Sequence, residues 1–92
     1  MSARADPAAV ADEQRRAERL RRTVDVACAV LRQGDLTRAE GEAVVALARE
    51  QALALFPGKG DVFDLVLGPR FRRVLDEFCP APSARVLTFR RR

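Results

Sequence analysis

With 92 residues, 48% of them hydrophobic and 33% charged, the chain fits one small folded domain and is too apolar to be disordered throughout. It has no histidine and only two cysteines, which excludes an imidazole base, a histidine-ligated metal and a cysteine-rich metal site. It also lacks a glycine-rich cofactor loop, so we expect no enzyme activity, no cofactor and no metal.

The basic residues are unusual in kind and in distribution. Sixteen of the seventeen are arginine, with Lys59 the only lysine, and the chain is rich in Ala and Val. This bias is typical of a GC-rich bacterial genome, so the arginines alone do not indicate phosphate contacts. The net charge of +4 divides into +2 over residues 1–34, −3 over 35–67 and +5 over 68–92. The basic excess therefore lies mainly toward the C-terminus.

Residues 1–16 contain no apolar run of the kind found in signal peptides. No other stretch approaches the roughly 20 apolar residues that a membrane span requires. We therefore expect a cytoplasmic protein.

The first predicted helix covers residues 7–33, after a disordered stretch at 1–6. Asp6 followed by Pro7 is typical of a helix start. The apolar positions recur at steps of three and four, at Ala17, Leu20, Val24, Ala27 and Leu31. The first half of the helix is charged on nearly every side, at residues 12–16, 18–19 and 21–22, whereas VDVACAVL is apolar on most sides. We expect the second half to be buried and the first half to project into solvent or onto a partner.

The second predicted helix covers residues 38–55. Gly34 occupies a helix C-terminal position, and Thr37 with Glu40 matches the capping box that begins a new helix. So short a connection predicts an antiparallel hairpin. The predicted buried stripe of this helix consists of Val44, Leu47, Ala48, Gln51 and Leu55.

Two short helices are predicted at 61–67 and 69–79, lying across the hairpin. Phe56-Pro57-Gly58 ends the second helix, Asp61 is a candidate cap for the third, and Gly68-Pro69 separates the third from the fourth. One apolar stripe continues in phase across that break, at Phe63, Val66, Leu67, Phe71, Val74, Leu75 and Phe78. The predicted fold is an all-α small helical bundle with a single helical domain at 7–79.

Residues 80–92 form a predicted Pro-containing, basic, extended tail. Its apolar residues Val86, Leu87 and Phe89 precede three arginines. Such a segment can remain solvated, fold back over the helices, or add as a strand to another chain.

Two other features have simple structural interpretations. Cys28 and Cys79 lie far apart in the sequence without a metal-ligand spacing, so we expect reduced structural thiols, and the sequence leaves open whether they pair. The glycines and lysine before Asp61 suggest an anion site but do not match a P-loop, and Asp61 would repel a phosphate. Asp61 and Asp64 are interpreted as helix-start carboxylates that complement the helix dipole.

Two functions are compatible with this pattern. The first is a small bacterial adaptor, regulatory or structural subunit that binds another protein or itself. The alternative is a nucleic-acid-associated accessory protein that binds polyanions through its arginines. The candidate surface for either partner comprises Arg15, Arg16, Arg19, Arg22, Arg70, Arg72, Arg73, Arg85, Arg90, Arg91 and Arg92.

Overall fold

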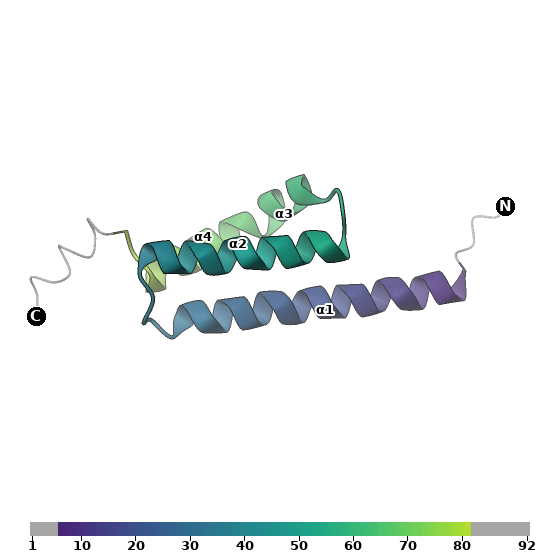
Figure 1. The fold of residues 1–92 in the computed structure, drawn as a ribbon, viewed down its shortest axis with the longest axis horizontal. Coiled ribbons are helices and arrows are strands. Elements are labelled where there is room, and N and C mark those ends of the chain that lie inside the picture. Colours follow the sequence, from purple (N-terminus) through teal and green to yellow (C-terminus); the bar gives the residue numbers. More distant parts are fainter. Residues whose placement is uncertain (1–5, 82–92) are drawn as a thin grey trace, which may run out of the picture.

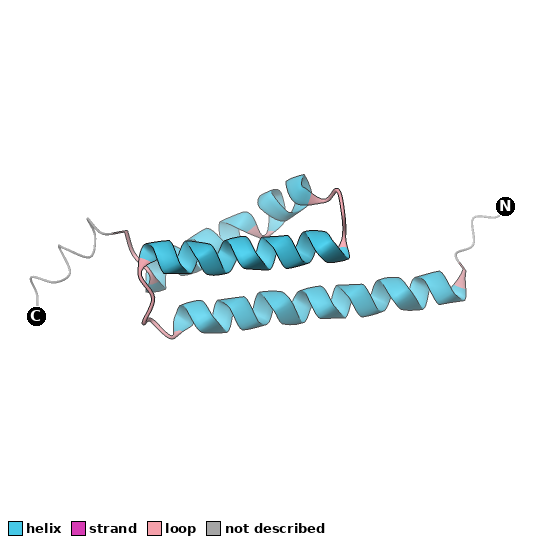
Figure 2. Ribbon diagram, in the orientation of Figure 1, coloured by secondary structure: helices cyan, strands magenta, loops and turns pink. Residues whose placement is uncertain are grey.

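The computed structural model describes residues 6–81, which contain four helices and no strand (Figures 1 and 2). The helices are α1 (Pro7–Arg32), α2 (Arg38–Leu55), α3 (Gly60–Val66) and α4 (Gly68–Phe78). The predicted all-α helical bundle is confirmed. Most of the predicted disordered N-terminus and basic tail lies outside the described residues.

Helices α1 and α2 run antiparallel as a hairpin (Figure 1). Gly34 takes a φ of +77° just after α1, a backbone conformation that side chains with a Cβ rarely adopt. At the start of α2, the Glu40 amide donates to Thr37 Oγ1 at 3.1 Å, and the Thr37 amide donates to Glu40 Oε1 at 2.9 Å. The predicted capping box is therefore present and fixes the turn.

The two halves of α1 differ as predicted. The second half supplies four buried residues, Val24, Ala27, Cys28 and Leu31. The first half extends past the end of α2 (Figure 1), and most of its side chains are exposed. Ala17, the first residue of the predicted seam, is exposed and borders a small hollow beside Leu67 and Arg70.

Helix α4 packs against both α1 and α2, and it lies behind them in the view of Figure 1. Phe71, which is 1% exposed, is the largest fully buried side chain, and its ring stacks on Phe63 with the centroids 6.0 Å apart. Cys28 and Cys79 are buried and unpaired, and the Cys79 thiol donates to the Leu31 carbonyl at 3.9 Å. One aliphatic and aromatic core therefore joins all four described helices, with Phe63 as the contribution of α3.

The predicted buried stripe of α2 was wrong in part. Only Ala48 of that stripe is fully buried, while Leu47 is 55% exposed and Gln51 is also exposed. The other buried positions of α2 are Gly41 and Ala52. The buried positions Gly41, Ala48 and Ala52 are spaced seven and four residues apart and so share one side of α2, and Leu47 lies beside that side.

Corrections also apply to α3 and α4. Each begins one residue earlier than predicted, so Pro69 is the second residue of α4. The Phe63 amide donates to the Lys59 carbonyl at 2.9 Å, which makes Lys59 rather than Asp61 the N-cap, and Asp61 lies in the first turn. Val66 was predicted to be buried but is 64% exposed, because α3 packs mainly on α2 and α4 and directs Val66 away from them.

Candidate protein-interaction surface

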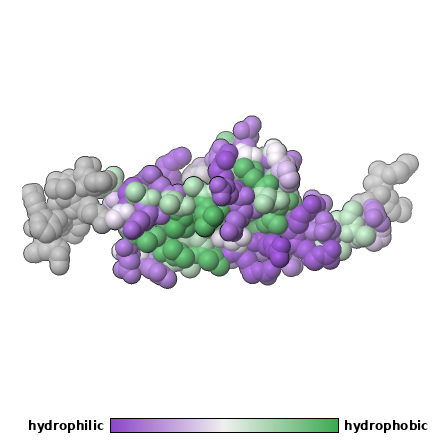
Figure 3. Space-filling view, in the orientation of Figure 1, coloured by the Kyte–Doolittle hydropathy of each residue, from purple (hydrophilic) through white to green (hydrophobic). Residues whose placement is uncertain are grey.

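In the described part of the chain, helices cover one side of the hairpin and leave the other side open. Helices α3 and α4 lie on the far side of α1 and α2 in the view of Figure 1, and the near side has no covering element among residues 6–81. On this uncovered side α1 and α2 enclose a groove of about 580 Å³. Figure 3 shows hydrophobic surface there, over the second half of α1 and the neighbouring part of α2. We call this region the hairpin groove.

The floor of the hairpin groove is apolar, and its walls carry exposed apolar side chains beside Thr23 and Gln51. Its floor contains the buried Ala27 and Ala48, and its walls carry Val26 of α1 and Leu47 of α2. Val26 is 62% exposed and Leu47 is 55% exposed, which is high for large apolar side chains in a chain with a small core. Exposed apolar side chains that gather on one face of a folded protein make that face a candidate docking surface.

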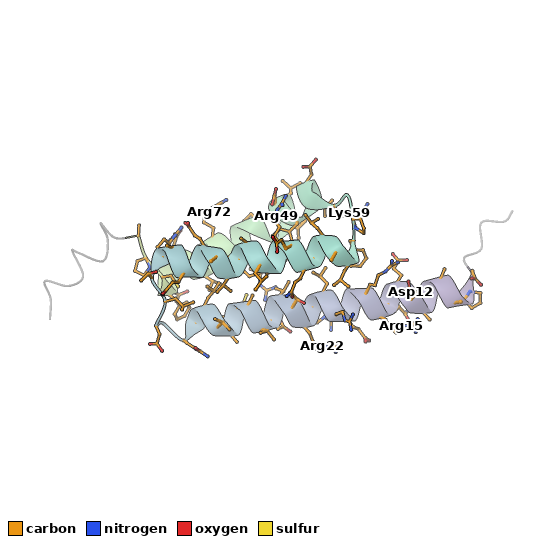
Figure 4. All side chains as sticks on the ribbon, viewed as in Figure 1. Asp12, Arg15, Arg22, Arg49, Lys59 and Arg72 are labelled. Carbon is orange, nitrogen blue, oxygen red and sulfur yellow. The ribbon has the colours of Figure 1, made fainter. Side chains whose placement is uncertain are left out.

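One end of the hairpin groove is basic. Arg19 and Arg22 line it, and the lining contains no carboxylate. Arg15, Arg19 and Arg22 are spaced four and three residues apart, so they share one side of α1, which continues into Val26 four residues later. Figure 4 places Arg15 and Arg22 along the same edge of the molecule. We call Arg15, Arg19 and Arg22 the arginine row.

Arg16 has a different environment from the arginine row. Its guanidinium carbon lies 5.6 Å from the centroid of the Phe56 ring, and its side chain is 42% exposed. A cation over an aromatic face at this distance is weakly stabilising. Arg16 therefore ties the projecting half of α1 to the end of α2.

The arginines of α4 are not part of this surface. Arg70, Arg72 and Arg73 are exposed, and Figure 4 places Arg72 at the opposite edge of the molecule from Arg15 and Arg22. Arg70 borders a small hollow against α1. The remaining candidates, Arg85, Arg90, Arg91 and Arg92, lie outside the described residues. The structure thus divides the described part of the predicted arginine set between two sides.

A second hollow, of about 490 Å³, lies between the middle of α1, the end of α2 and α3. It is lined mainly by apolar side chains, and its charged lining residues are Glu13 and Lys59. The exposed Val62 and Val66 of α3 extend its apolar wall. This hollow is a second apolar surface. Because its lining has one acidic and one basic residue, it does not favour a partner of either charge.

The charged groups with shifted pKa values belong to helix contacts, not to the hairpin groove. Arg38 donates to Asp76 of α4 at 2.8 Å and to Glu42 at 3.1 Å, and these hydrogen bonds raise its pKa. Arg49 donates to Asp64 of α3, which lowers the pKa of that carboxyl. Ion pairs between and along the helices account for these shifts.

Sequence reasoning did not identify Val26 and Leu47 as exposed residues of a candidate surface. On α1, the available signal was the stretch VDVACAVL. Its apolar residues occupy more sides of the helix than the packing of one core can bury. On α2, the signal was the pairing of Leu47 with the polar Gln51 on the stripe predicted to be buried.

Comparisons with protein-family models, curated proteins and solved structures found no match to this chain. Within residues 6–81, no cluster of three or more His, Cys, Asp or Glu side chains is placed to hold a metal ion. Among the helices in that part of the chain, each is too short or too polar to cross a membrane.

Proposed function

We propose that this protein is a non-catalytic interaction module that binds a helix of a partner protein in the hairpin groove. The observation that carries the proposal is the pair of exposed apolar side chains, Val26 and Leu47, on facing walls above a floor of alanines. A third helix lying on two antiparallel helices buries its own apolar stripe between them. The small floor residues let such a helix approach closely.

The energetics favour a binding surface of moderate affinity. Complete burial of a valine or leucine side chain contributes roughly 1.5–3 kcal/mol. Val26 and Leu47 already have part of their area covered, so a partner would gain a fraction of that from each. Micromolar binding requires roughly 8 kcal/mol in total, so Val30, Val44 and polar contacts at the groove would have to contribute as well.

The proposal places the protein among small bacterial, cytoplasmic adaptor, regulatory or structural subunits. Self-association through the same groove is the closest variant of this function. The alternative function, nucleic-acid binding, is supported by the arginine row, which presents cations along one side of α1. It is weakened by the position of Arg72 at the opposite edge and gives the apolar groove no role.

The test is site-specific photo-crosslinking in cells with a benzophenone amino acid at position 47. The matched control carries the same amino acid at position 72, which is exposed on the other side. We expect one protein to be crosslinked from position 47 and not from position 72. The purified partner should then bind the full chain, lose binding to Leu47→Glu and retain binding to Leu65→Glu. Equal crosslinking from both positions, or a partner indifferent to Leu47→Glu, would refute the proposal.

A further inference from the structure

We propose that the hairpin groove selects an acidic amphipathic helix, whose carboxylates lie against the arginine row while its apolar side chains cover Val26 and Leu47. This inference rests on the proposed function and specifies the chemistry of the partner. It follows from the order of residues along one side of α1, where cations and apolar side chains occupy separate, consecutive turns.

The spacing on α1 sets the spacing required of the partner. Arg22 and Arg19, the two arginines that line the groove, precede Val26 by four and seven residues, which corresponds to about 6 and 10 Å along a helix. The partner helix therefore needs apolar anchors at one end and carboxylates one to two turns further along. A helix with acidic residues spread evenly around it would not fit as well.

Two of the guanidinium groups are available for such a partner. Asp12 lies 3.6 Å from both Arg15 and Arg16. Within residues 6–81 no ion pair engages Arg19 or Arg22, the two arginines that line the groove. A carboxylate brought there by a partner would gain charge-assisted hydrogen bonds without displacing an existing acid.

Charge also argues against the two occupants that this chain itself could supply. A second copy packed groove to groove would present the same arginine-containing lining, and the carboxylates beside the arginine row, Asp12 and Glu18, lie outside that lining. Residues 82–92 contain four arginines and no acidic residue, so they would meet the arginine row with like charge. An acidic helix from another protein is the occupant that matches both the apolar and the basic parts.

The experiment is a selection from a library of helical peptides against the full-length chain. Each peptide has about 18 residues, long enough to span ~27 Å, with a fixed leucine stripe and every polar position coded for Glu or Lys. The baits are the wild type, Leu47→Glu, Arg19→Glu/Arg22→Glu, and Arg72→Glu/Arg73→Glu. The last two baits change the net charge equally but on different sides of the molecule. Circular dichroism establishes that each bait is folded.

On the wild type we expect Glu to be enriched over Lys by roughly tenfold, because each ion pair gained replaces a repulsion. The enriched Glu positions should cluster at one end of the peptide. Arg72→Glu/Arg73→Glu should keep this preference, Arg19→Glu/Arg22→Glu should lose or reverse it, and Leu47→Glu should enrich no peptide.

The outcomes separate the two proposals. If peptides bind only when Leu47 is present but carry Glu and Lys equally often, only the acidic-helix inference is overturned. The same holds if both double variants lose the preference for Glu over Lys to the same extent. Absence of Leu47-dependent binding would count against the proposed function and the inference together. Light scattering that shows a dimer dissociated by Leu47→Glu would overturn the inference in favour of a second copy.

Discussion

Arg49 of α2 and Asp64 of α3 form a two-point ion pair, with Nε donating to Oδ1 at 2.8 Å and Nη2 donating to Oδ2 at 3.1 Å. Helix α3 has only seven residues, and no side-chain hydrogen bond caps its start. Helices this short are not stable by themselves. The ion pair is therefore one of the contacts that hold α3 against α2.

This pair predicts a pH dependence for Asp64→Asn. The hydrogen bond from Arg49 lowers the folded-state pKa of Asp64 below its ordinary value of 3.8. The stabilisation is therefore present above that ordinary value and is lost as the pH falls through the lower, folded-state pKa. We expect Asp64→Asn to melt slightly below the wild type at neutral pH, with the difference vanishing in acid. The effect is small because both side chains are largely exposed.

Thermal melts of both proteins from neutral pH to about pH 2 test this prediction. Glu77→Gln, at an exposed position of α4, is the control for removing a carboxylate outside this contact. A difference between Asp64→Asn and the wild type that stays constant across the pH range would contradict the assignment.

We expect Gly41→Ala to destabilise the fold, because Gly41 lies in the contact between α2 and α4. A Cβ at this position would lie 2.7 Å from Leu75 Cδ2 and 3.1 Å from Cys79 Sγ. Gly41→Ala gains about 1 kcal/mol of helix propensity but overpacks the contact with α4, at a cost of about 1–3 kcal/mol. We expect a net decrease in the free energy of unfolding of about 1 kcal/mol, measured by urea denaturation.

Two variants complete that measurement. Ala43→Gly, at an exposed position of α2, measures the propensity difference without the contact. Combining Gly41→Ala with Leu75→Ala should cost less than the sum of the two, because the shorter side chain makes room for the new methyl. If Gly41→Ala raises the free energy of unfolding by as much as Ala43→Gly lowers it, then the contact of Gly41 with α4 is not tight.

Truncation to alanine should have a large effect on stability at Phe71 and almost none at Leu65. Phe71 is 1% exposed and Leu65 is 78% exposed. Phe71→Ala should lower the free energy of unfolding by about 3–5 kcal/mol, and Leu65→Ala should change it by less than about 0.5 kcal/mol. Urea denaturation followed by circular dichroism measures both. Comparable losses would mean that Leu65 is covered in solution.

The division of the arginines between two sides predicts weak interaction with nucleic acid. We expect no saturable binding of mixed-sequence DNA or RNA even at about 50 mM salt, where counterion release favours such binding most. Fluorescence anisotropy with labelled duplexes and single strands makes the measurement. Saturable binding that weakens steeply with salt would instead support the polyanion alternative, and comparison of Arg19→Glu/Arg22→Glu with Arg72→Glu/Arg73→Glu would then identify the side responsible.

The sequence by itself determined which segments are helical and how the first two are joined. Helix propensity, the Thr37–Glu40 capping box, the positive φ at Gly34 and the breaks at Pro57 and Pro69 are local signals. Each acts within a few residues of the chain, so none depends on the rest of the fold. The all-α bundle and the buried second half of α1 follow from these signals and from the apolar periodicity.

Only the tertiary structure decided which apolar side chains are core and which are surface. A period of 3.6 residues defines several adjacent stripes on a helix but does not tell which stripe meets a neighbour. The side of α2 that contains Gly41, Ala48 and Ala52 meets the core, which leaves Leu47 exposed, and the packing of α3 left Val66 exposed. The same packing left Val26 uncovered and set Arg72 opposite Arg22. The hairpin groove exists because α3 and α4 cover only one side of the hairpin, and that is a relation between helices that no local pattern specifies.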